Sequence, residues 1–255
     1  MTTDDPWDFY PCRVDDAPAS ISLTTRFQDG ARPKELDTLY VAGVHLEDAG
    51  EQGMGTAAEG ELIYAAEEEF REKLTPQGFT QVGRLRNKGS WQVSFYAATG
   101  KETEFHGLLA ITLATTGREV WTHIAADPTW NYYDTFLSPD EERRQWMSNR
   151  NLVEALEAKD DPLTTTRPVD HSTRFPNLTS ATAFKTASES LGFQTTLTEP
   201  TGDTDADPVY QVKAEREDPV NLTHIHGVVM ELTDLATSHG GEYEGWGCHA
   251  PVSTP

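Results

Sequence analysis

The chain has 255 residues and a formal net charge of −22, and the acidity is spread along its whole length. Residues 1–137 contain 22 acidic and 11 basic side chains and residues 138–255 contain 20 and 9, so each part carries −11. A surface of this sign repels phosphate, and we therefore expect no direct binding to nucleic acid. It favours a basic protein partner, which it would attract by electrostatic steering.

No stretch of the sequence approaches the roughly 18 apolar residues that a membrane span requires. The first residues, Met1 to Asp5, are acidic and lack the apolar region of a secretory signal, so we expect a cytoplasmic protein that does not contact membranes. Cys12 and Cys248 stand near opposite ends of the chain. In such a compartment, two reduced thiols are expected rather than a disulfide.

Residues 1–137 are expected to form a first domain with an α+β fold. Alternating apolar residues predict two strands within residues 6–28, and the first of them begins with Trp7-Asp8-Phe9-Tyr10. The elements expected after them are a strand over 38–46, a helix from Thr56, strands over 79–86 and 91–97, a helix over 102–114 and a strand over 119–126. This order, ββ(β)αββαβ, predicts helices packed on a mostly antiparallel sheet.

A cationic strand end interrupts the acidic pattern of this first domain. Arg84, Arg86 and Lys88 follow one another at every second position. Against the overall charge they form a local patch.

Two features separate the halves of the chain. The aromatic segment Trp130 to Leu137 is expected to pin one domain to the next by ring packing. Residues 138–160 then predict a linker helix, which ends at Asp160-Asp161-Pro162.

Residues 161–255 are expected to form a second domain with the order βαββαβ, the ferredoxin-like arrangement. Its first strand covers residues 165–175 and places Val169, His171, Thr173 and Phe175 on one face. An acidic turn is expected at residues 202–207, and a long amphipathic helix follows residue 222.

The last strand begins after a helix stop at Gly240-Gly241. Strict alternation predicts that Tyr243, Gly245 and Gly247 share one face. Glu242, Glu244, Trp246 and Cys248 would then share the other face.

No group of residues in the sequence forms a catalytic or metal-binding pattern. His224 and His226 are two positions apart on a predicted helix and point in nearly opposite directions. Asp170 and His171 are adjacent on a predicted strand, so they face opposite sides and cannot act as an acid–base pair. A neighbouring Glu244 would raise the pKa of the Cys248 thiol and make it a poor nucleophile. We therefore expect no enzymatic activity, no metal and no cofactor.

Three segments of the second domain resemble the RraB family, the regulator of ribonuclease E activity B: Thr166 to His171, Leu191 to Phe193 and Glu242 to Gly247. The resemblance covers about residues 145–255. The family signature usually reads Tyr-Asp-Gly-Trp, and Glu244 stands here in place of the Asp. The resemblance implies a ferredoxin-like fold and a non-catalytic protein that binds ribonuclease E and lowers its activity.

Residues 6–137 resemble an uncharacterised domain family that is often fused ahead of RraB-like domains. This second resemblance carries no activity.

The main hypothesis is a regulatory protein that binds a ribonuclease E-type enzyme. The residues proposed for partner binding on the basis of the signature and its neighbouring strand are Asp170, His171, Glu242, Tyr243, Glu244 and Trp246. The same residues could instead maintain the fold. The alternative function is an immunity or antitoxin-like protein that neutralises a basic nuclease or toxin, and an open sheet face would also allow a homodimer.

Overall fold

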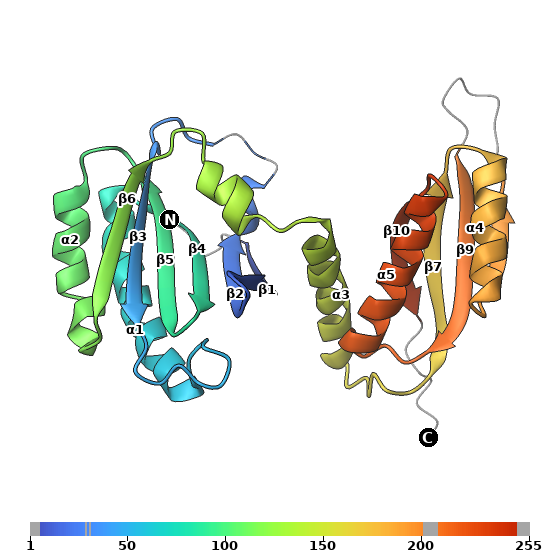
Figure 1. Ribbon diagram of the computed structural model, residues 1–255, viewed down its shortest axis with the longest axis horizontal. Coiled ribbons are helices and arrows are strands. Elements are labelled where there is room, and N and C mark those ends of the chain that lie inside the picture. The colour runs from blue at the N-terminus through green and yellow to red at the C-terminus, as the bar shows by residue number, and fades with distance from the viewer. Residues whose placement is uncertain (1–5, 29, 31, 201–208, 249–255) are drawn as a thin grey trace. The chain divides into compact units, whose positions relative to one another are not determined.

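The computed structural model describes residues 6–28, 30, 32–200 and 209–248. The chain forms two compact units, Met1–Arg143 and Arg144–Pro255, and each contains its own antiparallel sheet (Figure 1). The predicted α+β class with two domains is therefore confirmed. The acidic turn expected at residues 202–207 lies outside the described residues.

The first unit contains six strands, two α-helices and several short helical turns in its described part. Its strands are β1 Trp7–Val14, β2 Ala17–Thr24, β3 Thr38–His45, β4 Thr80–Asn87, β5 Ser90–Ala97 and β6 Val120–Ala126. Its helices and turns are η1 Thr25–Phe27, α1 Ala57–Leu74, η2 Thr75–Gln77, α2 Glu102–Ala110, η3 Leu113–Thr116 and η4 Tyr133–Leu137. The element order predicted from the sequence is confirmed.

The first sheet has the strand order β1-β2-β4-β5-β3-β6, and all neighbouring strands are antiparallel. Helices α1 and α2 lie on the same face of this sheet (Figure 1). There Phe70 of α1 and Phe105 of α2 pack on Phe95 of β5, with ring centroids 5.6 and 6.3 Å away. Such tilted and edge-on aromatic pairs bury large apolar areas and hold the helices on the sheet.

The aromatic segment after β6 belongs to the core of the first unit. Trp130 is buried and stacks on Tyr96 of β5 with ring centroids 4.1 Å apart, and its indole N–H donates to the carbonyl oxygen of Leu36. Tyr133 is also fully buried and makes an edge contact with Trp130. The expectation that these rings pin one domain to the next is wrong for Trp130 and Tyr133, because both rings are buried in the core of the first unit.

The second unit contains a four-stranded sheet and three helices in its described part. Its elements are α3 Glu141–Glu157, β7 Arg167–Phe175, α4 Leu178–Ser190, β8 Gln194–Thr198, β9 Tyr210–Asp218, α5 Leu222–Ser238 and β10 Glu242–Cys248. The strand order is β10-β7-β9-β8, with all pairs antiparallel. This is the order of a ferredoxin-like βαββαβ unit, so the predicted fold is confirmed.

Helices α4 and α5 lie on one face of the second sheet (Figure 1). Their buried side chains pack on Phe175 and Val212, which point inward from β7 and β9. As predicted, alternate residues of β7 are buried on this face: Val169, His171, Thr173 and Phe175. We call this covered side of the sheet the helix face and the other side the open face.

Helix α3 supplies part of the second core. Val153 and Leu156 are buried in a cluster with Val169 of β7 and with Ile225 and Val229 of α5. The division of the chain falls between Arg143 and Arg144, so most of α3 belongs to the second unit. The separate linker role of residues 138–160 stays a prediction.

Candidate functional site

The last strand, β10, contains a β-bulge at Glu244. Tyr243 lies opposite Thr173 of β7 and Gly245 lies opposite Ser172, so Glu244 is an extra residue without a counterpart. Gly245 has a φ of +147°, a backbone conformation that residues with a Cβ rarely adopt. This explains why glycine stands here, since a bulge requires an unusual local backbone.

The bulge brings Tyr243 and Trp246 to the same side of the sheet. Trp246 lies opposite His171, whose side chain is buried on the helix face, and residues directly opposite in a sheet share a face. Tyr243 and Trp246 both pack against the cluster around Val169 and Ile225. The prediction that they face opposite sides is therefore wrong, because one inserted residue reverses the alternation of every residue after it.

Polar contacts tie these two aromatic side chains into their own domain. The hydroxyl of Tyr243 is hydrogen-bonded to Nδ1 of His171 at 2.8 Å. The indole N–H of Trp246 donates to Oδ1 of Asn149 in α3 at 3.0 Å. The amide nitrogen of Asn149 in turn lies 3.0 Å from Nδ1 of His226 in α5. Buried polar groups that satisfy one another in this way fix the packing of a core.

His171 is fully buried between β9 and β10. Burial lowers the pKa of its imidazole to about 4, because the charged form loses its hydration; Arg216 lowers the pKa further, while Asp218 and Asp170 oppose the shift. Its ring also makes an edge contact with Phe193, with centroids 5.8 Å apart. His171 is therefore a neutral core residue at physiological pH.

The open face of the second sheet carries charged side chains. Those on the three strands β7, β9 and β10 are Asp170, Arg174, Lys213, Glu215, Glu217, Glu242 and Glu244. Five carboxylates and two cations give this face a formal charge of −3. Three ion pairs cross the strands: Lys213 pairs with Asp170 at 2.7 Å, and Arg174 pairs with Glu242 at 2.6 Å and with Glu244 at 4.0 Å.

Asp170 and Glu215 form a carboxylate pair on this open face. They lie directly opposite each other on β7 and β9. The hydrogen bond between the two carboxyl groups, together with burial, raises the pKa of Glu215. The hydrogen bond to Asp170 raises the pKa of the Lys213 ammonium. A cation placed over this pair would relieve the repulsion between the carboxylates.

The structure divides the six predicted residues into two groups. Asp170 and Glu242 point to the open face, and Glu244 stands at the bulge, 4.0 Å from Arg174. His171, Tyr243 and Trp246 point to the helix face. Sequence reasoning missed Arg174, Lys213 and Glu215, which face the first group from the same or neighbouring strands. Their alternation with buried residues was the available sign, but the strand order was needed to bring them together.

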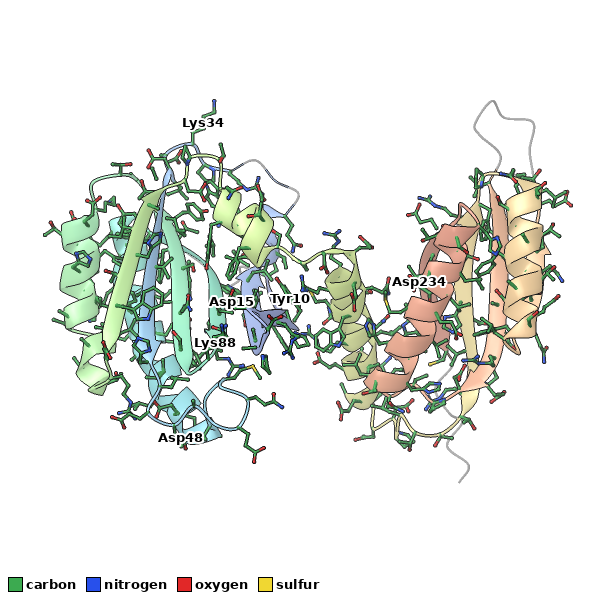
Figure 2. All side chains as sticks on the ribbon, viewed as in Figure 1. Tyr10, Asp15, Lys34, Asp48, Lys88 and Asp234 are labelled. Atoms are coloured by element: carbon green, nitrogen blue, oxygen red, sulfur yellow. The ribbon has the colours of Figure 1, made fainter. Side chains whose placement is uncertain are left out.

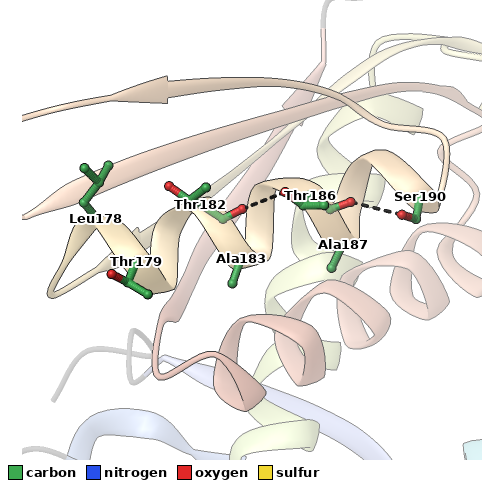
Figure 3. Close-up of a pocket in the computed structure, with 7 residues that line it drawn as sticks. All are labelled: Leu178, Thr179, Thr182, Ala183, Thr186, Ala187 and Ser190. Atoms are coloured by element: carbon green, nitrogen blue, oxygen red, sulfur yellow. Dashed lines mark hydrogen bonds between the residues drawn. The ribbon is translucent and has the colours of Figure 1, made fainter.

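A cavity of about 680 Å³ lies along α4, and all seven residues that line it come from that helix (Figure 3). Most of them are small. The hydroxyls of Thr186 and Ser190 donate to the carbonyl oxygens of Thr182 and Thr186 in the same helix, so they are not turned toward a ligand. This hollow lacks the converging polar groups of a ligand site.

Two histidines of α5 and the cysteine of β10 are the remaining candidates for chemistry. His224 and His226 stand on α5 as predicted, and His224 Nε2 lies 2.7 Å from Asp218 Oδ1. Burial raises the pKa of the Cys248 thiol, which makes a reactive thiolate less available. Among the described residues, no three His, Cys, Asp or Glu side chains are placed to hold a metal ion. No helix in the described part of the chain is long and apolar enough to cross a membrane.

Comparison with known families accounts for both units. Residues 146–248 match the family described as "Regulator of ribonuclease activity B", RraB, and they span the second sheet with its helices. Residues 5–138 match the "Family of unknown function (DUF695)", which is more than half of the chain. The chain belongs to the DUF695 family. Both resemblances stated from the sequence are thereby confirmed. In the sequence, the RraB-like domain of residues 146–248 follows the DUF695 domain.

Curated proteins and solved structures add little to this assignment. No curated protein matches the chain. A crystal structure of an unknown protein from Galdieria sulphuraria is 11% identical, with 82% of this chain and 96% of that chain covered and a TM-score of 0.24. A candidate glycine cleavage system transcriptional repressor is 12% identical, with coverages of 84% and 98% and a TM-score of 0.25.

Replacing Trp246 with alanine is expected to destabilise the RraB-like domain by about 2 kcal/mol, because the half-buried indole and its hydrogen bond to Asn149 are lost. Hydrogen exchange of β7 and β10 peptides in the full chain measures this change. Glu244→Ala is the matched control, since its side chain is exposed at the bulge, and it should leave exchange nearly unchanged. An unaltered exchange rate in Trp246→Ala would contradict a packing role.

Proposed function

We propose that this protein is a non-catalytic regulator that binds a ribonuclease E-type endoribonuclease through its RraB-like domain and lowers RNA cleavage. The observation that carries the proposal is the match of residues 146–248 to the regulator family. The ferredoxin-like strand order of the same residues supports it.

We place the binding surface on the open face of the second sheet. Three of the six residues predicted for partner binding, His171, Tyr243 and Trp246, are turned inward and bonded within the domain. The charged group around Asp170, Glu215 and Glu242 is turned outward. In the described part of the second unit, all three helices pack on the helix face, so they leave the open face accessible.

The negative charge of the open face favours a basic partner. A formal charge of −3 on one sheet face, within a chain of −22, attracts a basic surface and speeds its association. The same charge opposes pairing of this face with a second copy, because like charges would be placed opposite each other. A basic segment of the ribonuclease is therefore the favoured occupant.

Reversing two charges of the open face tests the proposal. The double variant Glu215→Lys, Glu242→Arg should weaken binding to ribonuclease E from the same organism by about tenfold or more and restore RNA cleavage, because two attractive contacts become repulsive. Affinity is measured with the purified full-length protein at low and moderate salt, beside a cleavage assay.

The double variant Glu231→Lys, Asp234→Arg supplies the control. Both residues are exposed on α5, on the opposite side of the domain, and the change in net charge is the same; Figure 2 labels Asp234. Equal losses in both double variants would show that net charge alone matters and would remove the open face as the site. Absence of binding by the unmodified protein at either salt would refute the proposed function itself.

A further inference from the structure

A second cleft, with a volume of about 620 Å³, lies on the first sheet, on the face opposite α1 and α2. Trp91 and Val93 of β5 are buried beneath those helices, so the alternate residues Ser90 and Gln92 point to the cleft. The residues that line it come from β1, β3, β4, β5, β6, η4 and two turns, all within the first unit. Small-molecule sites have volumes of this order.

Three polar side chains from two neighbouring strands form the floor of this cleft. Asn87 of β4 lies directly opposite Ser90 of β5, and Gln92 follows two positions later on the same face. Asn87 is 5% exposed and Ser90 is 8% exposed. Among the described residues, the Ser90 hydroxyl has no hydrogen-bond partner, and neither do the side-chain amides of Asn87 and Gln92. Because polar groups at this burial normally have partners, these three side chains are suited to bind a polar ligand.

Trp121 of β6 supplies a flat apolar wall beside these polar groups. Gly43 of β3 lies opposite both Gln92 and Trp121, so the three residues stand in one row across the sheet. The indole lies across Gly43, where a Cβ atom would overlap it, so this placement requires glycine. Phe136 of η4 also lines the cleft, but its ring already stacks on Tyr132 with centroids 5.0 Å apart. Trp121 is therefore the ring on which a planar ligand can stack.

The charged groups at the rim favour an uncharged ligand. Lys88 is the one lysine or arginine among the described residues that line the cleft, and it pairs with Asp15 at 3.3 Å. Figure 2 labels both residues. A phosphate group placed here would meet the carboxylate as well as the ammonium group, so the pair offers it little net attraction.

We propose that this cleft binds an uncharged nucleoside with an adenine base, which stacks on Trp121 and is hydrogen-bonded by Asn87, Ser90 and Gln92. A carboxamide presents a donor beside an acceptor, and the N6 and N7 edge of adenine presents the complementary pair. Aromatic side chains stack on the flat face of a base. A sugar ring lacks such a flat face, so it would use the polar floor but not the indole.

The proposed nucleoside site is separate from the proposed ribonuclease surface. Every residue of the site lies in the first unit, whereas the open face lies in the second. The inference therefore goes beyond the proposed function and does not rest on it. A nucleoside carries no phosphate, so the inference agrees with the expectation that a chain with a net charge of −22 binds no nucleic acid directly.

Isothermal titration calorimetry of the full-length protein with adenosine tests the inference. We expect a dissociation constant below about 1 mM. Gln92→Leu keeps the size of the side chain and removes its donor and acceptor, and it should weaken binding about tenfold at an unchanged melting temperature. Trp121→Ala removes the stacking ring and should weaken binding by about tenfold or more. Gln92→Leu alone decides the matter if Trp121→Ala does not fold.

Gln77→Leu is the matched control for Gln92→Leu. Gln77 is exposed at the end of η2 and does not line the cleft, so its replacement should leave binding unchanged. A dissociation constant above about 1 mM for adenosine would overturn the inference, as would equal losses in the two leucine variants.

Two further ligands distinguish the proposed nucleoside from its alternatives. Methyl glucoside should not bind, and binding of this sugar in place of adenosine would overturn the inference in favour of a carbohydrate. Adenosine monophosphate should bind no tighter than adenosine, because Lys88 is paired with Asp15. Tighter binding of the monophosphate would overturn the uncharged ligand in favour of a nucleotide. Each of these results leaves ribonuclease binding by the RraB-like domain untouched.

Discussion

Replacing Glu67 with alanine is expected to destabilise the DUF695 domain by about 3–5 kcal/mol, the largest effect that we predict for any single substitution in this unit. Glu67 is 1% exposed and accepts four hydrogen bonds. Two come from Arg84, and the others come from Gln81 and Trp91, each at 2.7 Å. Its removal would leave the guanidinium of Arg84 mostly buried without a counter-charge, and two further donors without an acceptor.

The pKa of Arg84 shows how strongly this residue interacts with Glu67. Burial alone would lower the pKa of the Arg84 guanidinium, but the hydrogen bonds and the charge of Glu67 outweigh burial and raise it. Hydrogen exchange of β4 and β5 peptides in the full chain measures the loss of stability. Removing the arginine as well, in Glu67→Ala, Arg84→Met, should recover part of it, because no buried charge is then left alone.

Glu69→Ala provides the comparison for this prediction. Glu69 lies on the same helix, is exposed, and pairs with Lys73 at 3.4 Å on the surface. Its replacement should change stability by less than about 0.5 kcal/mol. A cost below about 1 kcal/mol for Glu67→Ala would show that Arg84 finds another partner or solvent, and would contradict the role given to Glu67.

Most of what could be predicted about the second domain came from the alternation of apolar and polar residues along its strands. The period of two along β7 placed His171 inside and Asp170 outside, and the structure confirms this arrangement. The same period failed on β10, because the bulge at Glu244 exists only in relation to the register of β7. Gly245 was the one local sign of it, and glycine also occurs in regular strands where another backbone passes close by.

Contacts between strands could not be predicted, since they depend on which strands are neighbours. Lys213 and Glu215 meet Asp170 only because β9 lies beside β7. Phe9 of β1 and Arg84 of β4 likewise lie in one row of the first sheet only because β2 lies between their strands. Trp130 shows a related limit: a cluster of rings near a domain boundary must be buried somewhere, but its composition does not say against which core.

The RraB-like signature on β10 contains residues that pack inside the domain and residues that are exposed. Gly245 permits the bulge, and the bulge turns Tyr243 and Trp246 together into the helix face. Glu242 and Glu244 remain outside beside Arg174. Substitutions of the inward residues should lower stability, whereas substitutions of the outward residues should change partner binding. A loss of ribonuclease binding in a Trp246 variant can therefore be interpreted only when the stability of that variant is measured as well.

Acidification from about pH 6.5 to pH 4 is expected to destabilise the RraB-like domain by about 3 kcal/mol through His171 alone. The pKa of His171 is about 4 in the folded protein, whereas an unfolded histidine titrates near 6.5, so the unfolded state takes up the proton first. Above the pKa of the unfolded histidine, the titration of His171 does not change the free energy of unfolding. Stability then falls by about 1.4 kcal/mol for each pH unit as the pH drops toward the folded value.

The difference between the unmodified protein and His171→Gln isolates this effect from the titration of carboxylates such as Asp218. Hydrogen exchange of β7 and α5 peptides, measured across this pH range, reports the stability of the second unit in the full chain. The variant starts less stable, because the contacts with Tyr243 and Phe193 change, but its stability should depend less on pH. His239→Gln, near the end of α5, should keep the full dependence. Parallel pH curves for His171→Gln and the unmodified protein would mean that a charged imidazole is tolerated in the core. The assignment of His171 as a neutral packing residue would then fail.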